Sequence, residues 1–281
     1  MINFEGEIVQ DQHVNLNIEN RSFNYADGLF ETIRVINGKI MFWEDHYFRL
    51  MASMRILRME IPMQFSPEFL EAEILELLEA NKLTQQPARV KINVYRKPGG
   101  LYQPSTREVN YTIRTYELAN SFYILDEKDY EIELFKDHYL TSGLLSTLKS
   151  TNKIINVLAS IYAEENAYQN CLLVNEKKNI VEALNGNLFV VKGNNIKTAP
   201  LTDGCLNGIT RKKLIEIIKK TDDFTLEEAS VSAFELQKAD ELFITNVVMG
   251  IQPITKYRKK NFSAKVAKQL LAKLNTTARL G

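Results

Sequence analysis

Lys149 is the residue of this 281-residue chain that is best placed for imine chemistry. It stands in a polar stretch, residues 145–152, that leads into an apolar helical pattern over 154–162. A lysine at a helix start meets the partial positive charge of the helix N-terminus, which disfavours its ammonium form. A free amine attacks carbonyl carbons, so Lys149 is a candidate Schiff-base lysine. The alternative is an exposed lysine at a helix end.

Glu182 supplies the second half of that chemistry. It lies in an apolar, strand-like run, residues 180–184. An ionised carboxylate among aliphatic side chains is costly to bury unless a cation or donor pairs with it. The pyridine nitrogen of pyridoxal phosphate is such a partner, and the carboxylate keeps that ring protonated as an electron sink. Lys149 and Glu182 together predict this cofactor; a glutamate on an edge strand facing water is the alternative.

Residues 207–210, Asn-Gly-Ile-Thr, could bind the phosphate of such a cofactor. They open a predicted helix that continues to residue 220. Backbone N–H groups at a helix N-terminus attract anions, Gly208 permits close approach, and Thr210 adds a hydroxyl. The alternative is a plain helix cap.

Arg49 and the pair Thr245 and Asn246 are further candidates for the phosphate. Arg49 follows His46 on a predicted helix, and its guanidinium fork suits phosphate oxygens. Thr245 and Asn246 end a buried-looking strand and could add donors.

Composition narrows the class of protein. Thirty-five basic and 35 acidic residues cancel, which leaves no electrostatic case for nucleic acid. No apolar run approaches the roughly 18 residues that span a bilayer, and residues 1–7 lack the apolar region of a secretory signal, so we expect a soluble cytoplasmic protein without membrane contact. Two cysteines and three histidines lack metal-ligand spacing, so no metal site is predicted.

Periodicity predicts an α+β chain in two lobes. Asn37-Gly38 between two β-type runs predicts a hairpin, and helices are expected over 44–58 and 66–81. Alternating strands are expected near 90–95 and 111–116, before a domain boundary at 118/119. Further strands and helices alternate to the end of the chain, with later helices starting near Thr210, Ser232 and Ser263.

Several segments, taken in order, resemble the class IV (fold type IV) pyridoxal-phosphate enzymes. This family includes branched-chain and D-amino-acid aminotransferases and 4-amino-4-deoxychorismate lyase. The similar segments extend from about residue 21 to residue 250: residues 21–34, 46–50, 149–152, 182–189 and 208–211. Each motif is short, and their shared order carries the resemblance.

The resemblance implies a fold, a site and an oligomer. The fold would have a small N-terminal α/β domain, residues 1–118, and a larger mixed α/β-barrel-like domain, residues 119–281, that carries Lys149, Glu182 and the phosphate loop 208–210. Lys149 would form the Schiff base and move protons, and a homodimer is implied. The cofactor-binding residues would be Arg49, Lys149, Glu182, Asn187, Gly208, Ile209, Thr210, Thr245 and Asn246.

The reaction itself stays open between alternatives. The predicted function is a class IV aminotransferase acting on a small amino acid, because Phe30-Glu31-Thr32 is closer to the aminotransferases. Residues 96–104 lack the Arg-x-His motif of the D-amino-acid enzymes and resemble the loop of 4-amino-4-deoxychorismate lyase, the first alternative. A non-catalytic cofactor-binding relative is the second alternative. A substrate carboxylate would be held by residues among Tyr25, Arg34, Tyr95, Arg96 and Tyr102.

Overall fold

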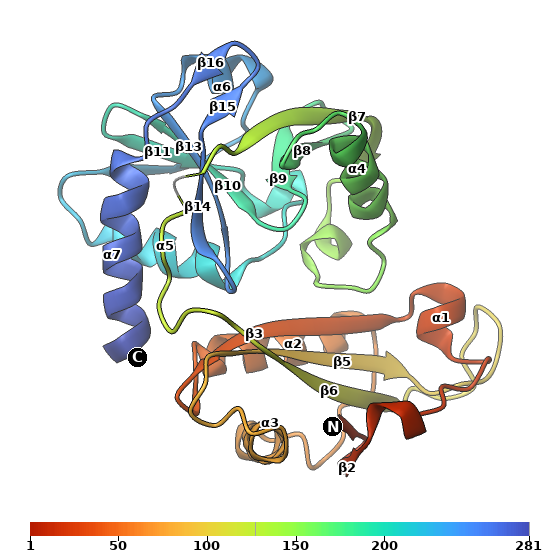
Figure 1. The fold of residues 1–281 in the computed structure, drawn as a ribbon. Coiled ribbons are helices and arrows are strands. Elements are labelled where there is room, and N and C mark those ends of the chain that lie inside the picture. Colours follow the sequence, from red (N-terminus) through yellow and green to blue (C-terminus); the bar gives the residue numbers. More distant parts are fainter. Residues whose placement is uncertain (127, 281) are drawn as a thin grey trace. The chain divides into compact units, whose positions relative to one another are not determined.

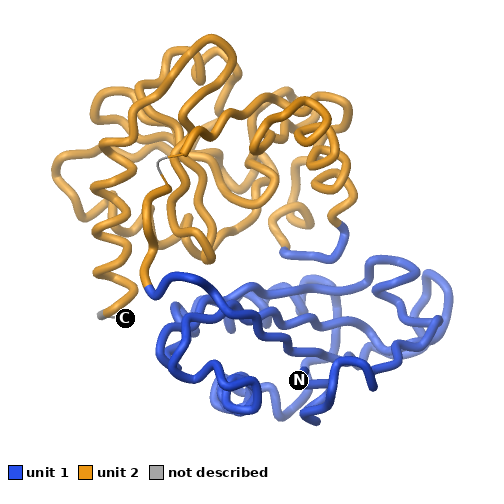
Figure 2. Tube along the Cα trace, in the orientation of Figure 1, with its two compact units in different colours: residues 1–121, 149–152 blue, residues 122–148, 153–281 orange. Residues whose placement is uncertain are grey.

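The computed structural model describes residues 1–126 and 128–280, which form two compact units. The first unit consists of Met1–Ser121 with Lys149–Asn152, and the second of Phe122–Leu148 with Lys153–Gly281 (Figure 2). In the described part of the chain, no helix is long and apolar enough to cross a membrane.

Unit 1 is built on an antiparallel sheet with the strand order β2-β1-β6-β5-β3-β4, formed within residues 1–126. Alternate side chains of β3 and β5 are buried, and the buried sides of α2 and α3 pack on the same sheet (Figure 1). The elements are β1 (Ile2–Phe4), β2 (Glu7–Val9), the 3-10 helix η1 (Asp11–His13), α1 (Arg21–Tyr25), β3 (Gly28–Ile36), β4 (Lys39–Ile40), α2 (Trp43–Ile56), α3 (Pro67–Ala80), β5 (Ala88–Arg96) and β6 (Val109–Glu117).

Local signals placed these elements well. The predicted hairpin forms between β3 and β4, with φ of 49° at Asn37 and 73° at Gly38, as a type I′ turn requires. Ser66 caps α3 by accepting a hydrogen bond from the Phe69 N–H, with Pro67 in the first turn. Both predictions are confirmed.

Unit 2 contains two sheets that share a core. Their strand orders are β12-β11-β10-β13-β14 and β16-β15-β7-β8-β9, all within residues 128–280. Leu134 and Leu172 from one sheet pack with Leu188 and Ile244 from the other. The strands are β7 (Glu131–Leu140), β8 (Asn170–Asn175), β9 (Ile180–Ala183), β10 (Asn187–Lys192), β11 (Asn195–Thr198), β12 (Thr225–Glu228), β13 (Glu241–Asn246), β14 (Gly250–Ile254), β15 (Lys256–Tyr257) and β16 (Lys260–Asn261).

The helices of unit 2 begin near the predicted positions, with one correction that concerns Lys149. Its helical segments are the 3-10 helices η2 (Leu144–Thr147) and η3 (Leu201–Asp203), and the α-helices α4 (Ile154–Glu165), α5 (Ile209–Lys219), α6 (Ala233–Lys238) and α7 (Lys265–Leu280). Lys153 is the N-cap of α4, so the prediction that Lys149 lies at a helix entrance is wrong.

The backbone of residues 149–152 explains their place in unit 1. The Phe30 N–H donates to the Lys149 carbonyl at 2.9 Å, and the Thr151 N–H donates to the Gly28 carbonyl at 2.9 Å. Lys149 was predicted to belong to the C-terminal domain. Its hydrogen bonds instead add it to the end of β3.

Glu241 should contribute strongly to the stability of unit 2. Its buried carboxylate accepts hydrogen bonds from the Ser263 hydroxyl and from the first N–H groups of α7, at Lys265, Val266 and Ala267. Glu241→Gln replaces one acceptor with a donor that faces other donors. We expect it to lower the free energy of unfolding by about 2 kcal/mol.

Urea unfolding followed by circular dichroism measures this effect. Glu165→Gln, at an exposed position at the end of α4, is the matched control and should change stability by less than about 0.5 kcal/mol. Equal stabilities for both variants would show that the cap is dispensable.

Candidate active site

Lys149 is held at both ends of its peptide segment and reaches over an aromatic ring. Ser150 forms an antiparallel β-bridge with Leu29, and the backbones of Lys149 and Thr151 are hydrogen-bonded to β3 on either side of it. The Lys149 Nζ lies 4.3 Å from the centroid of the Phe30 ring, and the side chain is half-buried. This geometry fixes the position of the amine relative to β3.

Arg49 is oriented by a buried carboxylate that the sequence analysis did not identify. Its Nε donates to Glu31 Oε1 at 2.7 Å, and its terminal NH2 donates to Glu31 Oε2 at 2.6 Å. His46, one turn before Arg49 on α2, contacts the same Glu31 oxygen through Nδ1 at 2.8 Å. The i, i+3 spacing places His46 and Arg49 on one face of α2, and this spacing was the only sequence signal that both could contact one carboxylate.

The protonation states of this cluster follow from burial and charge. Burial by itself raises the pKa of Glu31, but the charges and hydrogen bonds of Arg49 and His46 lower it to about 2. Burial lowers the pKa of His46, opposed by Glu31 and reinforced by Arg49 and Lys149. Near neutral pH, Glu31 is therefore an anion beside a neutral imidazole, and it keeps the cationic fork of Arg49 fixed.

Glu182 lies on β9, as predicted, with its side chain nearly buried. It is 8% exposed, and its Oε2 accepts a hydrogen bond from the Leu206 N–H at 2.7 Å. The reading of Glu182 as a carboxylate facing water is therefore wrong. One N–H donor stabilises the anion and directs it toward the segment that precedes α5.

Asn187 connects that segment with the neighbouring strand. Its side-chain N–H donates to the Leu206 carbonyl at 2.8 Å, and its backbone pairs with Thr245 on β13. A Cβ at Gly208 would collide with the Asn187 side-chain oxygen, and one at Gly186 would come within 2.6 Å of the Thr245 carbonyl. Glycine at position 186 lets two backbones approach closely, whereas glycine at position 208 leaves room for the Asn187 side chain.

The N-terminus of α5 fits an anion such as phosphate. Gly208 is the N-cap and offers no side-chain acceptor, so the first N–H groups of α5, including those of Ile209 and Thr210, have no side-chain cap. The hydroxyl oxygens of Thr210 and Thr245 are buried without a hydrogen-bond partner among the described residues. Buried hydroxyls normally have hydrogen-bond partners, so these two hydroxyls are candidates for hydrogen bonds to a bound ligand.

Asn246 has a different role from Thr245. Its side-chain N–H donates to the Asn185 carbonyl at 3.0 Å, and its side-chain oxygen accepts from the Val248 and Met249 N–H groups. These bonds hold the turn between β13 and β14. The hydroxyl of Thr245 is therefore the better placed donor of the pair.

Two of the predicted substrate residues are exposed, and two are buried. The rings of Tyr25 and Tyr102 contact each other in a tilted arrangement, with 5.8 Å between centroids, and Tyr102 is 91% exposed. Tyr95 is buried, which raises the pKa of its phenol to about 12, and the negative charge of Glu5 adds to that shift. Arg34 is buried and donates to the Asn120 carbonyl.

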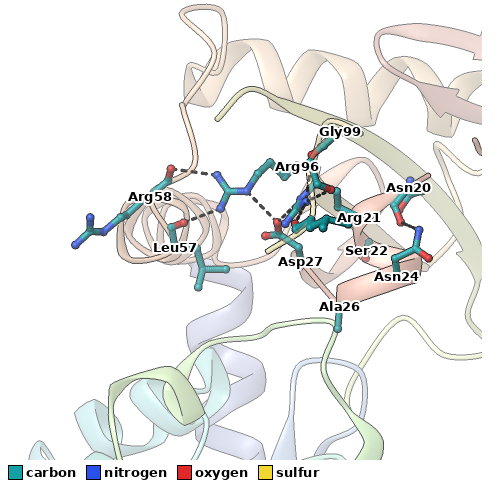
Figure 3. A network of polar contacts seen from close by, with 12 residues as sticks. Asn20, Arg21, Ser22, Asn24, Ala26, Asp27, Leu57, Arg58, Arg96 and Gly99 are labelled. Atoms are coloured by element: carbon teal, nitrogen blue, oxygen red, sulfur yellow. Dashed lines mark hydrogen bonds and ion pairs between the residues drawn. The ribbon is translucent and has the colours of Figure 1, made fainter. Parts of the chain in front are cut away.

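Arg96, the remaining substrate candidate, belongs to a structural network (Figure 3). It donates to Asp27 at 2.9 Å and to the Leu57 and Arg58 carbonyls at the end of α2. Arg21 donates to the same Asp27 oxygen and to the carbonyls of residues 99–101. Arg96 thus joins Asp27 to the end of α2, and its donors already have protein partners.

The described residues hold no group of three or more His, Cys, Asp or Glu side chains suited to a metal ion. Unit 1 supplies an amine and a guanidinium, and unit 2 supplies a buried carboxylate and an anion site. Lys149 and Arg49 belong to unit 1, whereas Glu182, Asn187, Gly208, Thr210 and Thr245 gather in unit 2.

Known proteins share both this fold and this sequence pattern. A family model described as amino-transferase class IV matches residues 28–257. D-alanine aminotransferase of Bacillus licheniformis is 27% identical over 261 residues, which cover 90% of this chain and 86% of that protein. Aminodeoxychorismate lyase of Vibrio harveyi is 26% identical over 237 residues, 84% of each chain. A branched-chain aminotransferase structure from Thermoproteus uzoniensis superposes with a TM-score of 0.87 at 24% identity, covering 98% of this chain and 93% of that one.

The fold is therefore fold type IV, the class of pyridoxal-phosphate enzymes that the sequence resembles, and the predicted α+β fold class is confirmed. The chain belongs to the class IV aminotransferase family. This membership confirms the predicted family, enzyme class and cofactor.

Proposed function

We propose that the chain is a pyridoxal-phosphate-dependent aminotransferase that acts on a small amino acid through Lys149. The observation that carries the proposal is the pair of unpartnered buried hydroxyls, Thr210 and Thr245, around the uncapped N-terminus of α5. Within the same unit, Glu182 is anchored to Leu206, which precedes this helix. The N-terminus of α5 would bind the cofactor phosphate, Glu182 would pair with the ring nitrogen, and Lys149 would react with the carbonyl carbon.

When bound, pyridoxal phosphate supplies an electrophilic carbonyl carbon and a ring that accepts electron density. Lys149 would provide the amine that reacts with that carbonyl. Its Nζ would also serve as the base and acid that moves a proton from the substrate Cα. Backbone bonds to β3 fix the segment that carries this amine, which favours a positioned proton transfer.

Glu182 would pair with the ring nitrogen and favour its protonated form. The Leu206 N–H favours the ionised form of the carboxylate, which can then pair with a pyridinium cation. Arg49 and the α5 N-terminus would bind the phosphate with a cation and with N–H donors, respectively. Glu31 matters indirectly, because it sets the direction of the Arg49 fork.

Replacing the Thr210 hydroxyl tests the phosphate site. Thr210→Val keeps the shape of the side chain and removes a donor. We expect the cofactor dissociation constant to rise at least about 10-fold, because one hydrogen bond to a charged group contributes about 1.5 kcal/mol or more. Fluorescence titration of the protein without cofactor measures this constant.

Thr276→Val, on α7, is the matched control and should leave the affinity unchanged. Unchanged affinity in Thr210→Val as well would remove this hydroxyl from the phosphate site.

The choice between transfer and lysis needs a direct assay. Phe30-Glu31-Thr32 favours the aminotransferase, because Glu31 there holds Arg49. Incubation of the purified enzyme with amino acids and 2-oxoglutarate should yield glutamate. Release of pyruvate and 4-aminobenzoate from 4-amino-4-deoxychorismate would identify the lyase instead. A yellow protein with neither activity would be the non-catalytic cofactor-binding relative.

A homodimer is also proposed, with α4 as the contact. Four large apolar side chains of this helix are exposed at helical spacing: Ile154, Val157, Leu158 and Ile161. A second copy of this chain could cover the same stripe by a self-complementary contact. Analytical ultracentrifugation of the wild type and of Val157→Glu would measure the loss of dimer, and a wild-type monomer would contradict the proposal.

A further inference from the structure

The segment that precedes α5 makes backbone contacts with two separate parts of the candidate site. The Leu206 N–H donates to Glu182, and α5 follows two residues later, with Gly208 as its N-cap. Between these two features, the backbone N–H of Asn207 donates to the Thr147 carbonyl at 3.1 Å. The proposed mechanism does not use this last hydrogen bond.

The loop that ends at Thr147 is held closely on the same segment of unit 2. Within the loop, the Thr147 hydroxyl donates to the Leu144 carbonyl at 2.7 Å, and the Ser146 hydroxyl donates to the Thr141 carbonyl. Gly204 has a φ of 97°, and a Cβ there would lie 3.0 Å from the Thr141 carbonyl oxygen. The loop and the segment before α5 are therefore in close contact at both ends of the loop.

Lys149 follows Thr147 by two residues. Consecutive Cα atoms are 3.8 Å apart, so the Cα atoms of these two residues are separated by at most about 7.6 Å. Leu148, between them, is buried and has an extended backbone. On its other side, the Lys149 carbonyl accepts the Phe30 N–H at 2.9 Å. One residue therefore separates the hydrogen bond from Asn207 and the hydrogen bond that holds Lys149.

This arrangement matters because the reacting amine has to match a ligand that is fixed elsewhere. A cofactor held by its phosphate at the N-terminus of α5 has a rigid ring, so its carbonyl carbon lies at a set distance from that phosphate. An error of about 1 Å in the position of a reacting group can cost about 100-fold in rate. The hydrogen bond between Asn207 and Thr147 joins the backbone next to the phosphate site to the backbone next to Lys149.

We propose that the backbone N–H of Asn207 is a positioning group, which places the Lys149 amine relative to the phosphate site. The N–H is engaged with Thr147, so it acts through the chain rather than by contact with the cofactor. The inference rests on the proposed function and adds a positioning group to it. Loss of the N–H should slow the attachment of the cofactor to Lys149 and leave phosphate binding intact.

Two variants at one position isolate the hydrogen bond from the side chain. Asn207→Pro removes the N–H, whereas Asn207→Ala keeps it. The full-length protein, freed of cofactor, is mixed with pyridoxal phosphate, reduced with borohydride at timed intervals and analysed by mass spectrometry. Attachment to Lys149 should be at least about 5-fold slower in Asn207→Pro than in Asn207→Ala, because one hydrogen bond shifts an equilibrium about 5-fold and misplacement of the amine adds to this.

Binding of pyridoxine 5′-phosphate separates positioning from phosphate binding. This probe has the ring and the phosphate but no carbonyl group, so it cannot attach to Lys149. Its dissociation constant should be the same in Asn207→Pro and Asn207→Ala, because the donors of α5 begin after this residue. Equal losses of attachment rate and of probe affinity overturn the inference, since Asn207 would then act in the phosphate site itself. Equal attachment rates in the two variants overturn it as well.

A backbone ester gives a second test, because proline also restricts the residue before it, which here holds Glu182. Incorporation of lactic acid at position 207 removes the N–H of Asn207→Ala without adding a ring. Attachment should be slower by a similar factor, and a rate equal to that of Asn207→Ala overturns the inference. A wild-type protein to which pyridoxal phosphate never attaches contradicts the proposed function instead, so the two failures are distinct.

Discussion

Lys149→Ala should abolish amino transfer and the reducible yellow chromophore together. Backbone hydrogen bonds to β3 hold the segment of Lys149, whereas the other amine near the Phe30 ring, that of Lys91, comes from β5. Loss of a positioned acid and base costs about 10²-fold to 10⁴-fold, and loss of the covalent attachment adds to that. We expect kcat to fall by at least about 10³-fold. Borohydride reduction followed by mass spectrometry would find the cofactor on the wild type only.

The matched control is Lys153→Ala, the N-cap of α4, which makes no side-chain cap. It should keep both colour and turnover. Full activity in Lys149→Ala, or cofactor trapped on another lysine, would show that Lys149 is not the reactive residue. Near-wild-type melting of both variants would exclude unfolding as the cause.

Glu182→Gln should reduce turnover far more than it reduces cofactor binding. The amide is nearly isosteric and can still accept the Leu206 N–H, but it has no charge to keep a pyridinium protonated. We expect kcat to fall by about 10²-fold to 10³-fold, the range in which one electrostatic partner of a reaction centre is removed. The phosphate contacts at α5 do not involve this residue, so occupancy should change little.

Stopped-flow spectroscopy measures the rate of the first half-reaction, and the intensity of the visible band gives the cofactor occupancy. Comparing the two shows whether Glu182→Gln affects turnover more than binding. Glu227→Gln, exposed on β12, provides the comparison and should react at the wild-type rate. Wild-type rates in Glu182→Gln would take this carboxylate out of the mechanism.

Local sequence signals predicted the elements because each is decided by neighbours in the chain. The Asn37-Gly38 turn and the Ser66 cap follow from backbone geometry within a few residues, and the alternation of β5 follows from one buried face. The start of α4 at Ile154 agrees with the helical pattern predicted over 154–162, but Lys149 lies before its N-cap, Lys153. The attachment of residues 149–152 to β3 depends on contacts across more than a hundred positions, which a periodic pattern does not encode.

The site residues likewise differ in whether their role depends on neighbours in the sequence or on contacts with distant segments. Glu182 was detectable because a carboxylate in an apolar strand is costly, and this cost can be read from its neighbours. The carboxylate of Glu31 is also buried, but it contacts His46 and Arg49 on α2, which follows the β3–β4 hairpin. These contacts could not be read from the neighbours of Glu31 in the sequence. Arg96 was read as a substrate residue because its type suits carboxylates, yet Asp27 and the end of α2 already satisfy its donors.

The contacts of Arg21 have a consequence for redesigning this enzyme. The guanidinium holds residues 99–101 through their main-chain oxygens, which every amino acid carries. Gly99 and Gly100 have positive φ and must be kept, but the outward side chains of Leu101 and Tyr102 take no part in that anchoring. These two positions can be randomised in a library while the path of the chain is preserved, which makes them a natural starting point for changing selectivity.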